Sequence, residues 1–108
     1  MIRASFTVNS DHHITAFQMT GHADSGPYGQ DIVCAAASAL SISTINGLEK
    51  VVGTHPQVES DQQNGGFLQV TAIDLGHDAQ ILVQTFLNGL QDIAESYPKN
   101  IEVKMFEK

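Results

Sequence analysis

The stretch from Asp78 to Tyr97 most constrains how this chain folds. Its apolar residues recur at intervals of three and four, at Ala79, Leu82, Val83, Phe86, Leu90, Ile93, Ala94 and Tyr97. This spacing lines one side of an α-helix with apolar side chains, and Pro98 then ends the helix. The sequence therefore predicts a long amphipathic helix that packs its apolar side against another layer of the protein.

Segments of alternating apolar and polar residues predict five β-strands around this helix. The alternation is clearest at 2–8, and residues 14–19 can return as the second strand of a hairpin. Residues 57–61 and 67–72 form a second pair, joined by a connection rich in Asn and Gly that is a strong hairpin signal. Residues 101–106 alternate as a last strand.

An alanine-rich stretch at 32–48 predicts a second helix. Asp31 has the chemistry of a residue that caps a helix, and the helix ends near Asn46-Gly47 or one turn later at Gly53. Because this helix carries little charge, we expect it to be buried. The resulting order, ββαββαβ, predicts an α/β (α+β) two-layer sandwich in which a mostly antiparallel or mixed sheet packs against two long helices.

Length and composition predict one soluble domain spanning residues 1–108. The chain is 42% hydrophobic and 16% charged, and its uninterrupted apolar runs are shorter than the ~20 residues that span a bilayer. The first residues do not resemble a signal peptide. The single cysteine cannot form an internal disulfide, which agrees with a reducing compartment. We therefore expect a cytoplasmic protein without membrane association.

The charge of the chain indicates the kind of partner it binds. Twelve acidic residues against five Lys and Arg give a net charge of −7, and the basic residues are dispersed, so they form no stripe that could follow a phosphate backbone. Direct binding of nucleic acid is disfavoured. A basic protein or a basic peptide tail is the better candidate.

The residues with the clearest chemical potential are His22, in a glycine-rich loop, and Cys34, near the start of the second expected helix. The nucleophilic form of cysteine is the thiolate, which the N-terminus of a helix and a nearby imidazole both stabilise. His22 could take the thiol proton and later protonate a leaving amine. This pairing predicts acyl transfer.

Other residues of the segment can support that chemistry. Asp31 and Ser38 share a helix side with Cys34, so Asp31 can orient His22 and Ser38 can bond near the sulfur or the substrate. Three glycines of the preceding loop can let it move or admit a substrate backbone, at Gly21, Gly26 and Gly29.

The same residues also have ordinary structural explanations. Cys34 can be a small buried apolar residue, Asp31 only a helix cap, and Ser38 a packing residue. His22 can be a solvated loop residue, and the glycines can be turn residues. A zinc site needs several ligands close together, and this chain has one cysteine and scattered histidines, so we expect no metal site. The sequence also contains no cofactor-binding motif.

The segment from 21 to 40 contains Gly21-His22-Ala23, then Gly29-Gln30-Asp31-Ile32-Val33-Cys34-Ala35-Ala36, then Ser38-Ala39-Leu40. It closely resembles the signature of the ribosomal-processing cysteine proteases, the Prp family of bacteria. Chain length and the ββαββαβ order agree with that family.

The resemblance implies a cytoplasmic endopeptidase, without a cofactor, that removes a short N-terminal extension from large-subunit ribosomal protein number twenty-seven. The family's catalytic histidine and cysteine fall on His22 and Cys34, and Asp31 and Ser38 match fixed positions of the family. The family's members are homodimers, and their substrate tails carry aromatic residues before the cut.

Two further hypotheses remain beside the peptidase. The chain can be a non-enzymatic dimeric adaptor or ribosome-assembly module that binds a basic protein tail without cutting it. It can also be a thiol redox sensor, which is the weaker hypothesis because no second cysteine exists to resolve an oxidised Cys34.

Overall fold

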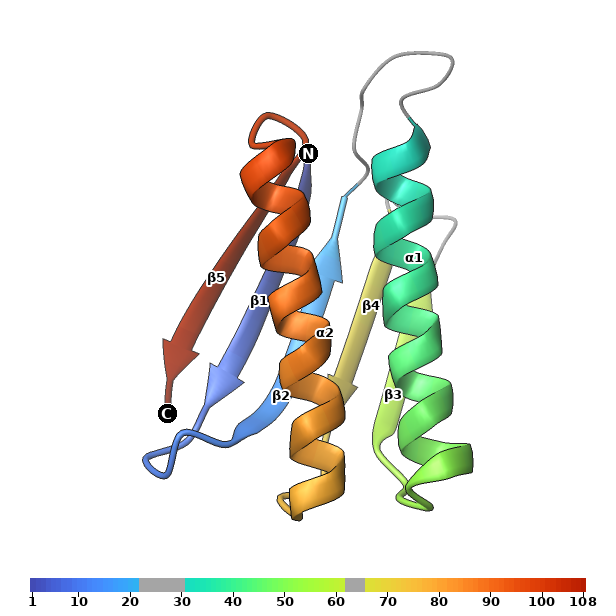
Figure 1. The fold of residues 1–108 in the computed structure, drawn as a ribbon, viewed down its shortest axis with the longest axis vertical. Helices are drawn as coiled ribbons and strands as arrows, with labels where there is room; N and C mark the ends of the chain where they lie inside the picture. The colour runs from blue at the N-terminus through green and yellow to red at the C-terminus, as the bar shows by residue number, and fades with distance from the viewer. Residues whose placement is uncertain (22–30, 62–65) are drawn as a thin grey trace.

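The computed structural model describes residues 1–21, 31–61 and 66–108 (Figure 1). The elements run β1 (Ile2–Val8), β2 (Ile14–Thr20), α1 (Asp31–Asn46), a π-helical turn (Gly47–Val51), β3 (Gln57–Asp61), β4 (Phe67–Thr71), α2 (His77–Ser96) and β5 (Ile101–Glu107). The expected order ββαββαβ is confirmed. β4 ends one residue early because Ala72 has a φ of 54°, outside the strand conformation.

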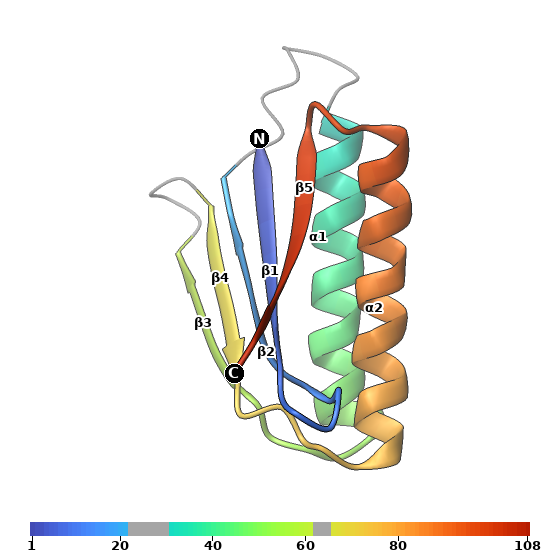
Figure 2. The same ribbon diagram turned by 90° about the vertical axis from the view of Figure 1, so that its left-hand side faces the viewer.

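The five strands form one mixed sheet in the order β3-β4-β2-β1-β5. β1 and β5 are parallel, whereas the other neighbouring strands are antiparallel. Both helices lie on the same face of the sheet, so the molecule has two layers (Figure 2). This is the α+β sandwich that the sequence predicts.

The core lies between the sheet and α2. Phe6 of β1, Phe17 of β2 and Phe86 of α2 pack as a cluster, with ring centroids 4.9 to 5.6 Å apart. Four of the predicted apolar residues of α2 are buried, namely Ala79, Val83, Phe86 and Leu90, and Gln80 and Leu87, which the predicted spacing did not include, are buried beside them. Tyr97 is an exception, because it follows the last residue of α2 and is 41% exposed.

Gln80 is a polar member of this core, and its side chain joins α2 to the first hairpin. Its Oε1 accepts a hydrogen bond from the Ile14 N–H at 2.8 Å, and its Nε2 donates to the carbonyls of Ile14 and Asp74 at 2.8 and 3.0 Å. A buried amide satisfied in this way costs little to bury. It fixes the start of α2 against the start of β2.

The helical segment that begins with α1 continues to the later of the two predicted ends. After Asn46 one π-helical turn follows, in which the Val52 N–H donates to the Gly47 carbonyl. Gly53 then adopts a φ of 81°, a left-handed conformation that favours glycine.

The expectation that α1 is buried is only half right. Val33 and Ala37 of α1 and Leu48 of the π-helical turn are buried, but Ile32 and Ile42 are more than half exposed. By length and composition alone, Ile32–Val51 is apolar enough to cross a membrane, which inspection of uninterrupted apolar runs missed. In this fold the segment is helical, packs one side on the core and leaves Ile32, Ile42 and Val51 exposed on its outer side.

Candidate active site

Cys34 lies in the first turn of α1, one residue after the buried Val33. Its side chain is half-buried and packs against the hydrophobic core. The N–H groups of a helix's first turn have no acceptor inside the helix, and together they favour an anion nearby. The fold therefore places the only thiol beside backbone N–H groups that can stabilise a developing oxyanion.

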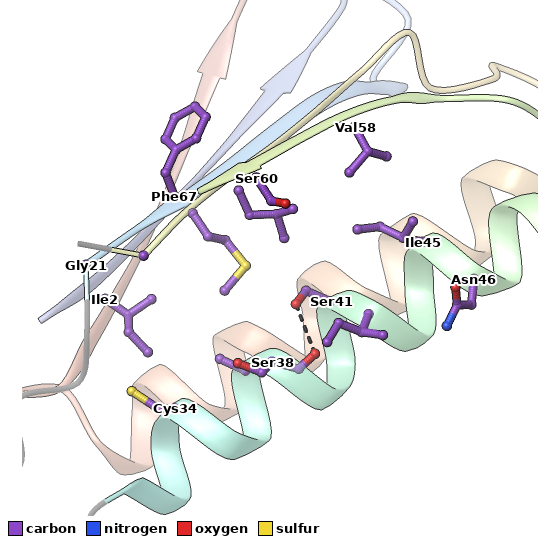
Figure 3. A pocket seen from close by; sticks show the side chains of 15 residues that line it. Ile2, Gly21, Cys34, Ser38, Ser41, Ile45, Asn46, Val58, Ser60 and Phe67 are labelled. Atoms are coloured by element: carbon purple, nitrogen blue, oxygen red, sulfur yellow. Dashed lines mark hydrogen bonds between the residues drawn. The ribbon is translucent and has the colours of Figure 1, made fainter. Parts of the chain in front are cut away.

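Cys34 also lies at one end of a groove of about 420 Å³ (Figure 3). One wall is α1, and the facing wall is formed by β3, β4 and the nearest parts of β1 and β2. The described residues that line it are all uncharged: Ile2, Met19, Gly21, Cys34, Ala37, Ser38, Ser41, Ile42, Ile45, Asn46, Val58, Ser60, Gly66, Phe67 and Leu68. Among the described residues, the acidic side chains therefore lie outside the groove lining.

The helix wall of the groove is a single stripe, because Ser38, Ser41 and Ile45 follow Cys34 by four, seven and eleven residues. Ser38 is exposed, and its carbonyl accepts a hydrogen bond from Ser41 Oγ at 3.1 Å. The Ser38 side chain thus lies one turn from Cys34, on the side of α1 that lines the groove.

The other predicted site residues fall into two groups. Asp31 is the first residue of α1 and so lies inside the helix, not before it as a cap. His22, Gly26 and Gly29 lie outside the described residues, so their roles stay predictions from the sequence. Within the described residues, no three His, Cys, Asp or Glu side chains gather in a way that could hold a metal ion.

Gly21 is held where the groove meets β1 and β4. Its φ is 87°, and its N–H donates to the Gly66 carbonyl at 3.0 Å. A Cβ at this position would overlap the carbonyl oxygen of Met1. Both the backbone conformation and the space at this position therefore require glycine.

We expect Gly21→Ala to destabilise the protein by about 2–3 kcal/mol, because a left-handed alanine costs ~1 kcal/mol and the overlap with Met1 adds to it. Gly53→Ala is the matched control, since Gly53 has a φ of 81° but nothing within 4 Å of its added Cβ, so it should lose only about 1 kcal/mol. Urea unfolding measures the loss of stability in both variants. Equal losses in the two variants would show that the contact with Met1 has no effect.

Sequence reasoning missed most of the groove. Ser41 and Ile45 could have been found, because they share the helical side of Cys34. Val58 and Ser60 gave no local signal, since they reach the groove only through the pairing of β3 with β4.

Comparison with known proteins identifies the family of this fold and site. Residues 1–102 match the family model for cysteine protease Prp. The ribosomal processing cysteine protease Prp of Staphylococcus aureus (strain Mu50 / ATCC 700699) is 40% identical over 104 residues, which are 95% of this chain and 97% of that protein. The chain belongs to the Prp family of cysteine proteases. The Prp of Bacillus subtilis (strain 168) is 30% identical over 107 residues, 95% of this chain and 96% of that protein.

Solved structures of the family share the fold over nearly the whole chain. Prp from S. aureus in complex with a covalently linked product peptide has a TM-score of 0.90 and 39% identity, covering 98% of this chain and all of that one. The same enzyme with a substrate peptide has a TM-score of 0.87 and 38% identity at the same coverage.

These relationships establish the class of protein. The chain is a cysteine peptidase for ribosomal processing, so the hypotheses of a non-enzymatic adaptor and of a redox sensor give way to the enzyme.

Proposed function

We propose that this peptidase removes the N-terminal extension of large-subunit ribosomal protein number twenty-seven, with Cys34 as nucleophile and His22 as general base and acid. The observation that carries the proposal is the position of Cys34, in the first turn of α1 and at one end of a groove of about 420 Å³ whose described lining residues are uncharged. The product peptide linked covalently to the S. aureus relative supports a covalent mechanism.

The reaction proceeds in two steps. His22 takes the proton of Cys34, and the sulfur attacks the scissile carbonyl carbon to form a tetrahedral intermediate, whose oxyanion the first turn of α1 stabilises. The C–N bond then breaks, His22 protonates the leaving amine, and a thioester remains on Cys34. Water, deprotonated by His22, hydrolyses the thioester to a carboxylate and restores the thiol.

The positions of Ser38 and Asp31 on α1 support two further proposed roles. Ser38, exposed one turn along α1, faces the path of the peptide and is proposed to hydrogen-bond to it. Asp31 begins the same helix and is proposed to orient His22. The net charge of −7 suits a basic ribosomal substrate.

The direct test is incubation of the purified protein with the precursor ribosomal protein, followed by mass spectrometry of the whole reaction. The proposal expects two products whose masses add to that of the precursor plus one water. A precursor that keeps its mass would contradict the assigned substrate.

We further propose a cytoplasmic homodimer. The hollow between the outer sides of α1 and α2 is lined by the exposed apolar residues Ile42, Val51 and Ile81, together with Lys50 and Asp78. A two-fold related copy can bury the apolar side chains and pair the opposite charges.

Light scattering should give twice the chain mass of 11.6 kDa, and Val51→Lys should return the protein to a monomer. A wild-type monomer that floats with lipid vesicles would instead assign this surface to a membrane.

Fractionation of cells should recover the protein with the cytoplasm, and recovery elsewhere would contradict the proposed compartment.

A further inference from the structure

We propose that the end of the groove remote from Cys34 is a specificity pocket, and that Ile45 and Val58 there bind an apolar side chain about five residues before the scissile bond. This inference rests on the proposed function, because it assumes that the acyl group of the substrate is attached at Cys34. It adds a subsite distant from the reacting atoms.

The distance follows from the geometry of α1. Ile45 is eleven residues beyond Cys34 on the same helical stripe, which at 1.5 Å per residue is about 16 Å along the axis. An extended peptide advances about 3.3 Å per residue, so a peptide anchored at Cys34 reaches Ile45 with about its fifth residue. Figure 3 shows Cys34 at one end of the groove and Ile45 and Val58 facing each other at the other.

At the remote end, the facing side chains of Ile45 and Val58 are apolar and partly exposed, and the polar Asn46 lies next to Ile45 in the lining. Val58 points toward the groove from β3 and is 40% exposed, although its neighbour on β4, Val70, is fully buried. Ile45 is partly buried across from it. No charged residue of the described chain lines the groove. An apolar side chain placed between Ile45 and Val58 would remove their remaining surface from water.

The middle of the groove differs from its far end. Ser38 and Ser41 on α1 and Ser60 on β3 bring small polar side chains to the lining. Such residues leave room for a peptide backbone and can hydrogen-bond to it. The groove therefore combines a polar middle for backbone with an apolar end for a side chain.

The side of the scissile bond follows from the chemistry of the thioester. After the first step the amine product must leave, whereas the acyl product stays on Cys34 until water attacks. A subsite that binds the acyl side does not delay departure of the amine. In the proposed function the removed extension lies before the cut and becomes the acyl group on Cys34, which lines the groove, so we assign the groove to the residues on the amino-terminal side of the cut.

The test pairs enzyme variants with peptide variants. The first peptide carries leucine at the fifth residue before the cut, and two others carry Asp or Lys there. For the wild-type enzyme, Asp in place of Leu should lower kcat/KM roughly tenfold or more, mostly through KM. Val58→Asp should lower kcat/KM for the leucine peptide similarly and partly restore it for the lysine peptide. Leu75→Asp, a charge at a 48% exposed site outside the groove, should change neither.

Binding provides a readout independent of catalysis. Fluorescence anisotropy of the same labelled peptides with Cys34→Ala should show the same order of affinities, and adding Val58→Asp should weaken the leucine peptide. If the wild-type enzyme cleaves the peptides but is indifferent to the fifth residue, the pocket is wrong and the proposed function stands. If it cleaves none while Cys34→Ala binds them in the predicted order, the pocket stands and the proposed chemistry fails. Sensitivity only to residues after the cut would overturn the assigned direction.

Discussion

Cys34→Ala is expected to reduce cleavage of the precursor by at least about 10⁴-fold. Without the thiol no thioester can form, and only binding and oxyanion stabilisation remain, which is why removing the nucleophile of a protease is so costly. Because Cys34 is half-buried at the edge of the core, a loss of one sulfur atom should leave the fold intact. Single-turnover cleavage, followed by mass spectrometry, measures the loss.

Two controls separate chemistry from structure. Ser96→Ala removes an exposed hydroxyl at the end of α2, outside the lining of both the groove and the hollow between the helices, and should keep wild-type activity, while Cys34→Ala should keep its circular dichroism spectrum and affinity for peptide. His22→Ala should lose about 10²–10⁴-fold, as expected for a general acid and base. Cleavage by Cys34→Ala at more than a tenth of the wild-type rate would remove Cys34 from its proposed role.

Phe86→Ala is expected to destabilise the protein by about 3–5 kcal/mol, a large part of the total stability of about 5–15 kcal/mol typical of a small domain. The Phe86 ring is 3% exposed and packs on Phe6 and Phe17 at 5.6 and 4.9 Å between ring centroids. Removal of the Phe86 ring leaves a cavity between α2 and the strands β1 and β2.

Phe106→Ala is the matched control, because the same side chain is 52% exposed at the sheet edge and its loss should cost about 0.5 kcal/mol or less. Urea unfolding measures the free energy of unfolding of both variants, and the dependence of that free energy on urea concentration is compared between them. Equal losses would mean that the aromatic cluster does not stabilise the core.

The fold was predictable where a pattern was long or alternated cleanly. The spacing at 78–97 predicted α2 to within one residue at each end, and the alternation at 2–8 predicted β1. In each case one side of the element meets the core and the other meets water, so the sequence period reports the packing directly.

The sequence was less informative about α1. Low charge suggested burial, but charge alone does not say how many sides of a helix are covered, and Ile42 proved more than half exposed. The sequence also did not predict the position of Val58 in the groove. Val58 lies opposite Ile45 because of how β3 pairs with β4 and how far α1 lies from both strands. The thiol could be found from local chemistry, whereas the groove beside it depends on tertiary structure.

The most direct test of the account is the mass of the enzyme quenched during turnover of the precursor. A thioester at Cys34 predicts an added mass equal to the released extension minus one water, carried by the proteolytic fragment that contains Cys34 and lost on treatment with hydroxylamine. Cleavage without any such adduct under conditions where product accumulates in a burst, or an adduct on another residue, would contradict the assignment of Cys34 as the nucleophile.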